Sequence, residues 1–485
     1  MRPVQLLFAL SMLWGVALPA MAAKPEESVV KVLASVRYPN PIRPWTNTQP
    51  NEMVGTGVVI EGKRILTNAH LTLYATDVAV QFRPGEDKFT AKVEAIAPDM
   101  DLALLSLADE TFFDKHPALP RAAKLPRVQD NVAVYGFPIG GNDLSVTKGV
   151  VSRIDHGPYL RMGFGQIIQI SAAVNPGNSG GPAVVNDEMI GLVFSRLNDS
   201  EGVGYVIPNE EIATFLADTA DGRYDGKPVD ATGTDFQMLE NPSLRAFLKL
   251  DRKVKGVMAV PPTRPPQDYP LKEFDVITKV AGQEVDNQGT ITMPDGTRMP
   301  IHSLIGKVGG NGSVMLTVLR GGQTLEIPLK TTTKDLRLIR EYRGEKPSYF
   351  IHGPLVFGNA KADAIGFYAR LNPGLFNGRS PLLLRRFDRV AFPDEELVVV
   401  TSPMFKHKLV EGYNEVVGMV LAEVNGVKIR NLRHLVEVLR DCKDEFLVFR
   451  FADIGNEVMV LNRAEMAKVT DEILEDNGIS PNRRG

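Results

Sequence analysis

The stretch Gly177-Asn178-Ser179-Gly180-Gly181-Pro182 decides how the rest of the chain is interpreted. A serine between glycines predicts a tight turn that exposes the hydroxyl, because glycine tolerates unusual backbone angles. Such a turn also directs backbone N–H groups toward one point, where an oxyanion can be stabilised. Ser179 is the candidate nucleophile, and the loop Gly177, Asn178 and Ser179 is the candidate oxyanion hole, chiefly through the N–H groups of Gly177 and Ser179. The competing interpretation is an ordinary glycine-rich hairpin loop.

Two further segments supply partners for a serine nucleophile. The hydroxyl needs a neutral imidazole to accept its proton, and His70 ends an apolar strand in Thr67-Asn68-Ala69-His70. Asp101 opens the apolar run 101–105, where its carboxylate can be buried against the imidazole and fix its tautomer. Asp99 is the alternative carboxylate. Each residue taken alone has an ordinary interpretation, as a strand-end histidine or a solvated turn carboxylate.

The arrangement of the three segments predicts the fold. Short apolar runs alternate with turn residues from about residue 28 to 215, which is typical of a β-sandwich or barrel. The order His, Asp, Ser along the chain is that of chymotrypsin-like enzymes and differs from the order in α/β-hydrolases and subtilisins. We therefore expect His70, Asp101 and Ser179 to form a catalytic triad on a mainly β domain.

The same segments resemble the three signature segments of the HtrA/Deg family of serine proteases. The resemblance covers nearly all of residues 28–217, and it also rests on the runs 55–60, 136–140, 145–152 and 204–208. It implies a trypsin-like double β-barrel followed by PDZ domains, which are mixed α/β modules. The implied activity is ATP-independent endopeptidase cleavage of unfolded or damaged proteins, in trimers or multiples of trimers.

The remaining chain divides into two related modules. Both contain a strand, a gap and a strand–turn–strand with glycine at the turn, around residues 275–285 and 419–429. Polar linkers separate the units. The predicted organisation is a signal peptide, a protease domain, two PDZ-like domains and a tail, covering residues 1–22, 23–222, 228–333, 345–465 and 466–485.

PDZ domains bind peptides as an added strand, and a glycine-containing loop holds the terminal carboxylate. In the first module that loop would lie near Gly233-Thr234-Asp235-Phe236, where the charge of Asp235 would repel a carboxylate. In the second module Gly353-Pro354 lacks one N–H donor. We therefore expect the modules to bind internal segments or each other. The patterns at 240–245 and 347–351 resemble those of the Deg subgroup with two PDZ modules.

The N-terminus predicts export. Arg2 precedes the apolar run 6–18, and Ala20-Met21-Ala22 is a small-x-small cleavage site. An uncleaved membrane anchor is the alternative, but the run is short for roughly 30 Å of hydrocarbon, and no later segment resembles a membrane helix. With a single cysteine, Cys442, no internal disulfide can form, which favours a periplasmic or secreted protein that is not built on disulfides.

Composition excludes several other classes. The net charge is −3 with no strongly basic half, so a nucleic-acid groove is not indicated. No zinc-type cluster and no phosphate-cradling loop are present, so we expect no metal, no ATP and no other cofactor. The rival function is an inactive or weakly active peptide-binding chaperone or adaptor that acts through its PDZ-like modules.

The pocket for the side chain before the cut is predicted from two segments near the serine. Its candidate residues are Ala173, Val174, Val193, Phe194 and Ser195. Ala173 stands where specificity for Lys or Arg needs a buried carboxylate, so cleavage after small or medium aliphatic residues is expected. The alternative is that Asp187, Glu188 or Asp199 reaches the pocket from a loop.

Overall fold

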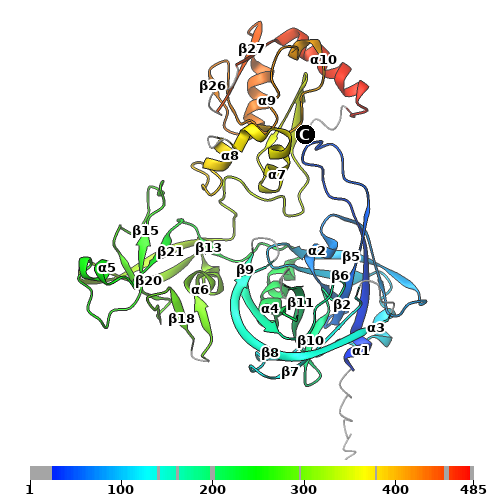
Figure 1. Cartoon of the computed structure of the whole chain (residues 1–485), viewed down its shortest axis with the longest axis vertical. Coiled ribbons are helices and arrows are strands. Elements are labelled where there is room, and N and C mark those ends of the chain that lie inside the picture. The colour runs from blue at the N-terminus through cyan, green and yellow to red at the C-terminus, as the bar shows by residue number, and fades with distance from the viewer. Residues whose placement is uncertain are drawn as a thin grey trace, which may run out of the picture.

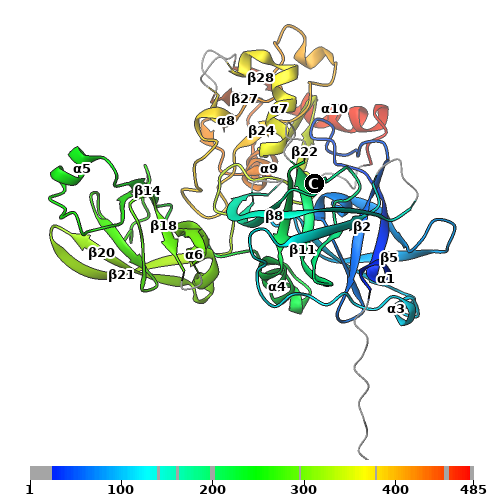
Figure 2. The same cartoon turned by 60° about the horizontal axis from the view of Figure 1, so that its bottom comes forward.

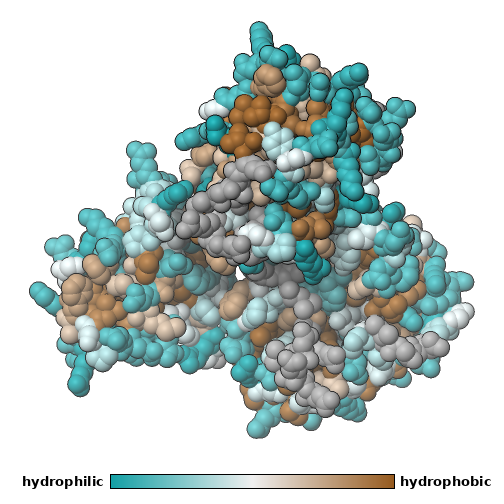
Figure 3. All heavy atoms as spheres, turned by 45° about the horizontal axis from the view of Figure 1, so that its top comes forward, coloured by the Kyte–Doolittle hydropathy of each residue, from teal (hydrophilic) through white to brown (hydrophobic). Residues whose placement is uncertain are grey.

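The computed structural model describes residues 24–138, 143–159, 163–196, 202–293, 296–376, 380–452 and 458–480. Within these ranges the chain forms three lobes joined by short connections (Figures 1 and 2). Their surfaces are mostly hydrophilic, with hydrophobic residues gathered in separate patches (Figure 3). The predicted signal peptide, residues 1–22, lies outside the described residues.

The first lobe contains two closed six-stranded β-barrels, as predicted. The strand order of the first barrel is β1-β2-β3-β6-β5-β4. Alternate residues of β1 point into its core, which follows from the two-residue repeat of a strand. The elements are α1 (Pro25–Ser28), β1 (Val29–Val36), β2 (Asn51–Ile60), β3 (Arg64–Thr67), α2 (Ala69–Thr72), β4 (Ala75–Gln81), β5 (Lys88–Ala97), β6 (Leu102–Leu107) and α3 (Phe112–Lys115).

The second barrel has the strand order β10-β11-β12-β9-β8-β7 and is followed by helix α4. The sequence predicts this helix with Asn209 as its cap, but Asn209 is the first helical residue and caps nothing. Its amide instead donates hydrogen bonds to the carbonyls of Ala122 and Met189, which fix the helix to the barrel. The elements are β7 (Asn131–Gly136), β8 (Ser145–Pro158), β9 (Phe164–Ile170), β10 (Pro182–Val185), β11 (Glu188–Arg196), β12 (Gly204–Pro208) and α4 (Asn209–Asp218).

The second lobe is a β-sheet with two helices and a separate hairpin, β18–β19. Its sheet runs in the order β13-β21-β20-β16-β15-β14, with β17 paired to β16. The elements are β13 (Val229–Asp230), β14 (Asp235–Met238), α5 (Pro242–Phe247), β15 (Val257–Val260), β16 (Val276–Val280), β17 (Gln283–Glu284), β18 (Thr290–Thr292), β19 (Arg298–Pro300), α6 (Ile301–Val308), β20 (Ser313–Arg320) and β21 (Gln323–Thr332).

The third lobe places two small sheets and several helices around one core. The sheets have the orders β22-β23-β24 and β26-β25-β27-β28. The elements are β22 (Tyr349–His352), β23 (Leu355–Asn359), α7 (Ala362–Leu371), α8 (Pro381–Leu384), β24 (Val398–Val400), β25 (Leu421–Val424), β26 (Val427–Lys428), α9 (Leu432–Asp441), β27 (Phe446–Phe451), β28 (Met459–Asn462) and α10 (Arg463–Asp476).

The predicted internal repeat is confirmed at two hairpins. In the second lobe β16 and β17 are joined by Ala281-Gly282, and in the third lobe β25 and β26 are joined by Asn425-Gly426. All four turn residues have positive φ, between 47° and 79°. Two consecutive positive φ angles are those of the tight hairpin turn that favours Asn-Gly.

The predicted domain end at residue 465 is wrong, because it cuts helix α10. Met466, Val469, Thr470, Ile473 and Leu474 are buried along one side of this helix. Leu474 and Ile479 pack against Tyr349, Ile351 and Val356 of the β22–β23 hairpin. The third lobe therefore includes the described residues up to 480, and only 481–485 of the predicted tail lie outside them.

A long loop of the first barrel, residues 37–50, reaches the third lobe (Figure 1). Trp45 stacks on Phe405 with ring centroids 5.8 Å apart and lies 6.1 Å from the ring of Tyr349. The hydroxyl of Ser402 donates a hydrogen bond to the carbonyl of Ile42. The first and third lobes are thus in direct contact although more than 300 residues separate these segments.

Candidate active site

His70 and Asp101 lie in contact. The Nδ1 atom of His70 is 2.8 Å from Oδ2 and 3.0 Å from Oδ1 of Asp101, and the backbone N–H of His70 donates to Oδ1 at 2.9 Å. The aspartate is 2% exposed, while the imidazole keeps one edge accessible. This geometry orients the ring and favours the tautomer with its proton on Nδ1.

The backbone around Asp101 is held in an unusual conformation. Asp101 has φ 55°, in the left-handed region that costs a non-glycine residue roughly 1 kcal/mol or more. The buried amide of Asn68 donates a hydrogen bond to the carbonyl of Asp101 at 2.9 Å. Asn68 of the run Thr67–His70 therefore has a structural role. Its side chain links the segment that carries His70 to the turn that carries Asp101.

The glycines beside Ser179 are required by close packing. A Cβ atom at Gly180 would lie 2.0 Å from the carbonyl oxygen of Thr56 and 2.5 Å from Oγ1 of Thr67. A Cβ atom at Gly181 would lie 2.0 Å from the carbonyl oxygen of Tyr135. Gly180 also has φ 85°. The serine loop can pack against β2 of the first barrel at Gly180 and against β7 of the second barrel at Gly181 only because both positions lack a side chain.

Thr56 joins the serine loop to the histidine strand. Its N–H donates to the carbonyl of Ser179 at 2.9 Å, and its hydroxyl donates to the carbonyl of Gly177 at 2.7 Å. The same hydroxyl accepts from the N–H of Phe137, and the carbonyl of Thr56 accepts from the hydroxyl of Thr67. Sequence reasoning missed this role, although Thr56 lies in the run 55–60, and only the contacts across the two barrels reveal it.

The predicted oxyanion hole contains two available donors. Within the described residues, the N–H groups of Gly177 and Ser179 donate to no acceptor of the chain, whereas the N–H of Asn178 donates to the carbonyl of Asn175 at 3.0 Å. Asn178 therefore shapes the turn. Gly177 has φ 101°, which glycine alone tolerates easily. The loop can thus offer two N–H groups to a developing oxyanion.

The alternative carboxylate, Asp99, does not contact His70. It lines a cavity beyond the turn, together with Arg337 and Arg343 from the segment that connects the second and third lobes. The carboxylates of Asp99 and Asp101 thus have different surroundings, and only that of Asp101 contacts the imidazole of His70.

The predicted pocket residues have mixed surroundings. Ala173 is exposed and Val174 and Val193 are buried. Phe194 is 3% exposed and packs edge-on against Tyr159 at 5.4 Å, so its ring belongs to the core of the barrel. Ser195 lies on β11, paired with Tyr205, and its side chain lies outside the described residues.

The acidic residues that could have reached this pocket are differently placed. Asp187 lies in the turn of the β10–β11 hairpin and Glu188 is the first residue of β11, both at the end remote from Ser179, because Pro182 at the serine end pairs with Leu192. They are therefore too far along the hairpin to line a pocket beside the serine. Asp199 lies outside the described residues.

In the second and third lobes, the loops expected to bind a peptide terminus form hydrogen bonds with other groups of the same chain. In the second lobe the buried carboxylate of Asp230 accepts from the N–H groups of Thr232 and Thr234, both at 2.7 Å. In the third lobe the N–H of Gly353 donates to the hydroxyl of Thr470 on α10 at 2.7 Å. Helix α10 covers this loop, since a Cβ at Gly353 would lie 2.3 Å from the sulfur of Met466.

The described part of the chain contains neither a candidate metal centre nor a helix suited to span a membrane. No group of three or more His, Cys, Asp or Glu side chains there could hold a metal ion. Among the helices of the same residues, none is both long and apolar enough to cross a bilayer.

Comparison with known proteins agrees with the geometry. The trypsin-like peptidase domain family matches residues 55–192, and the PDZ domain family matches residues 340–484. "Protease Do-like 2, chloroplastic" from Arabidopsis thaliana is 35% identical over 94% of this chain and 74% of its own length. "Protease Do-like 4, mitochondrial" from the same organism is 31% identical over 92% and 83%.

A solved structure shares the fold. The HtrA-type protease AlgW with a tripeptide aligns with a TM-score of 0.50 and 22% identity over 64% of this chain and 94% of that chain. Barrels, serine loop and relatives together define the class of the protein, which is a serine endopeptidase with a trypsin-like domain and a PDZ domain. The chain belongs to the HtrA/Deg family of serine proteases, as its sequence indicates.

Proposed function

We propose that the protein hydrolyses unfolded or damaged proteins without ATP, through an acyl-enzyme formed on Ser179. The observation that carries this proposal is the buried carboxylate of Asp101 on Nδ1 of His70, beside a serine loop with two available N–H donors. This is the arrangement needed for a neutral imidazole to accept a proton from a serine hydroxyl.

The proposed steps follow from these groups. The Oγ atom of Ser179 attacks the scissile carbonyl, and Nε2 of His70 accepts its proton. The N–H groups of Gly177 and Ser179 stabilise the oxyanion, and Asp101 stabilises the imidazolium. His70 then protonates the leaving amine, and an acyl-enzyme remains. Water activated by His70 hydrolyses this ester and regenerates the serine.

We propose a preference for small or medium aliphatic residues before the cut. The exposed position of Ala173 and the remote position of Asp187 and Glu188 support it, because none of them supplies a buried carboxylate for Lys or Arg. Discrimination among aliphatic side chains is expected to be shallow, since one methylene is worth about 1–3 kcal/mol. Mapping casein cleavage sites by mass spectrometry tests the preference, and a dominant Lys or Arg signal would contradict it.

The proposed setting is protein quality control outside the cytoplasm, after cleavage of the signal peptide at Ala22, in a homo-oligomer of trimers or their multiples. In both PDZ-like lobes, N–H groups of the loop expected to bind a chain end already donate hydrogen bonds within the protein. This supports binding of internal segments of unfolded chains rather than of chain ends. N-terminal sequencing of the exported protein tests the cleavage site. Light scattering of the purified protein tests the oligomer.

Ser179→Ala is the decisive variant. It is expected to abolish casein digestion and labelling by a fluorophosphonate while the circular dichroism spectrum stays unchanged, because one oxygen is lost from a turn. Residual catalysis of roughly 10³–10⁴-fold over water from binding and the oxyanion hole would be invisible in this assay. Digestion by the variant at the wild-type rate would disprove the assignment, and a wild type that is never labelled would favour a binding protein.

A further inference from the structure

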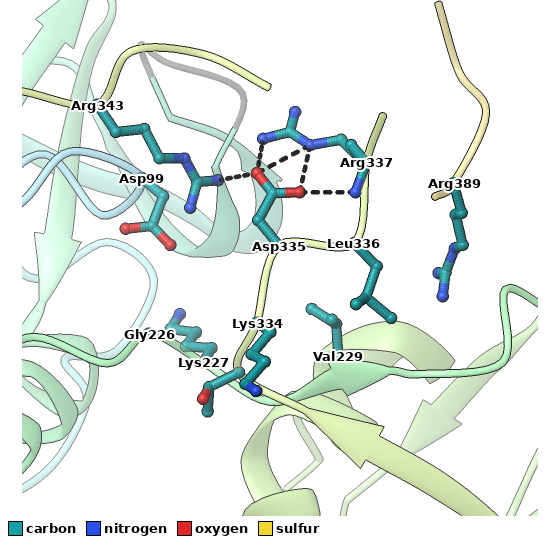
Figure 4. A pocket seen from close by; sticks show the side chains of 11 residues that line it. Asp99, Gly226, Lys227, Val229, Lys334, Asp335, Leu336, Arg337, Arg343 and Arg389 are labelled. Carbon is teal, nitrogen blue, oxygen red and sulfur yellow. Dashed lines mark hydrogen bonds and ion pairs between the residues drawn. The ribbon is translucent and has the colours of Figure 1, made fainter. Parts of the chain in front are cut away.

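A polar cavity lies where the three lobes meet. It has a volume of about 250 Å³ and is lined by the end of the first lobe, the start of the second, the connecting segment 333–343 and a loop of the third (Figure 4). This volume is below the roughly 300–1,000 Å³ of sites for drug-sized ligands. A ligand of this cavity is therefore small.

The cavity is strongly basic. Its cationic lining residues are Lys227, Lys334, Arg337, Arg343 and Arg389, against only two acidic ones, Asp99 and Asp335. Glu211, just behind the cavity, forms an ion pair with Lys227. The charge of Glu341 also acts on Arg337, so the five cations face four carboxylates.

Asp335 organises one wall of the cavity. Its carboxylate is bidentate with Arg337, at 2.6 and 2.9 Å, and Arg343 lies 3.9 Å away. Burial would raise the pKa of Asp335, but the hydrogen bonds and charge of Arg337, with the charge of Arg343, lower it below its ordinary value. Asp335 therefore stays ionised and holds the guanidinium groups of Arg337 and Arg343 at this wall of the cavity.

Two cations of the lining, Lys334 and Arg389, have no carboxylate partner within the described residues. Lys334 is exposed and forms no side-chain hydrogen bond or ion pair there. Arg389 donates to the carbonyl of Asp230 at 3.0 Å and packs on Gly233, so its guanidinium is placed by neutral contacts alone. Figure 4 shows both side chains beside the cavity, with Arg337 near by.

We infer that this cavity is a binding site for a small oxyanion with two or more negative charges, such as phosphate or pyrophosphate. Arginine forks match the geometry of such oxygens, and Lys334 and Arg389 have no carboxylate partner within the described residues, so their charges can be balanced by the ligand. The cations come from the linker at Lys227, the connecting segment and Arg389 of the third lobe, so a bound anion would hold these three segments together. It also fixes the connecting segment against Asp99, two residues before Asp101.

The test is independent of the proposed catalysis and uses full-length mature protein with Ser179→Ala to prevent self-digestion. Pyrophosphate is titrated by calorimetry, and the melting temperature is followed at constant ionic strength adjusted with NaCl. Saturable binding with one site per chain and a rise in melting temperature are expected. Lys334→Gln, which removes no contact within the described chain, is expected to weaken binding about tenfold without changing the melting temperature in the absence of pyrophosphate.

Lys253→Gln is the matched control, since Lys253 is equally exposed and lies outside the cavity, in the loop after α5. It should bind as the unsubstituted protein does. The inference is overturned if pyrophosphate stabilises no more than NaCl, or if the two lysine variants lose affinity equally. Binding of an oligoglutamate peptide without binding of pyrophosphate would also overturn it, because the ligand would then be an acidic protein segment.

Discussion

Asp101 and Asp99 are chemically identical and two residues apart, yet their surroundings separate them. Asp101 is buried on His70, whereas Asp99 faces the arginines of the connecting segment. Asp101 has a left-handed backbone conformation in this turn, and its carboxylate contacts the imidazole. The role of a carboxylate here depends on backbone direction and not on residue type.

Asp101→Asn is expected to lower kcat by roughly 10⁴-fold, because the amide favours the wrong imidazole tautomer. Asp99→Asn is the matched control and should keep most of the activity. Hydrolysis of a chromogenic peptide by both variants, with melting temperatures as a check on folding, decides between them. The reverse result would move the catalytic role to Asp99.

Thr56 is a second residue whose role depends on its surroundings, because its buried hydroxyl contacts the serine loop and not the substrate. Thr56→Val keeps the shape but leaves the carbonyl of Gly177 and the N–H of Phe137 unpaired in a buried site. The expected cost is about 1–3 kcal/mol of stability. A displaced serine loop is also expected to lower kcat/KM by roughly 10–100-fold.

Urea unfolding and peptide hydrolysis measure the two effects of Thr56→Val. Thr214→Val is the matched control, since the hydroxyl of Thr214 donates to the carbonyl of Glu210 on the exposed side of α4. Equal effects of both variants would show that the contacts of Thr56 are not special.

Among the elements, β8 connects the catalytic lobe to the second lobe. His156 lies on this strand, where the hairpin strand β19 packs against it. Burial lowers the pKa of His156, although the charges of Glu211 and Asp155 oppose the shift. Its Nδ1 atom is buried and has no hydrogen-bond partner. Protonation of this ring is therefore disfavoured by its position between the two lobes.

His156 predicts a pH dependence of stability. The unfolded chain binds the proton near its ordinary pKa of about 6.5, and the folded chain binds it only at lower pH. Unfolding therefore takes up a proton in this window, and stability falls as the pH drops below about 6.5. His156→Gln should flatten the fall in melting temperature between about pH 7.5 and 5.5. An identical slope in both proteins would contradict this role.

At the scale of the whole molecule, the third lobe is fixed from two sides. The loop 37–50 reaches it through Trp45, and the connecting segment touches the turn after α2, where the N–H of Gly344 donates to the hydroxyl of Tyr74 at 3.1 Å. Tyr74 follows His70 by four residues. The position of the third lobe is therefore linked physically to the segment that carries the imidazole.

Trp45→Ala is expected to loosen the third lobe, because aromatic pairs contribute about 0.5–1.5 kcal/mol beyond their buried area. Hydrogen exchange at β22 and α10 should become faster, while exchange in the two barrels should stay the same. The experiment uses the Ser179→Ala background. Phe247→Ala is the matched control, since Phe247 is 66% exposed on the second lobe. Unchanged exchange at β22 would show that the contact does not hold the lobes together.

The double barrel was implied by the resemblance to the HtrA/Deg family, whereas patterns within single segments predicted a mainly β domain, the repeated hairpins and the residues proposed for catalysis. These features are local: Gly177–Pro182 needs glycine for its turn, the apolar alternation defines the strands, and Asn425-Gly426 specifies a hairpin. Sequence position also limited the carboxylate to Asp99 or Asp101.

The contact of Asp101 with His70, the hydrogen bonds of Thr56, the docking of α10 and the basic cavity are visible only in the folded molecule. Each depends on contacts between segments far apart in the chain, such as Thr56 with Gly177 or Gly353 with Thr470. A residue pattern indicates the local structure that one segment prefers. The partner of a buried hydroxyl and the balance of charges in a cavity depend instead on which segments the fold brings together.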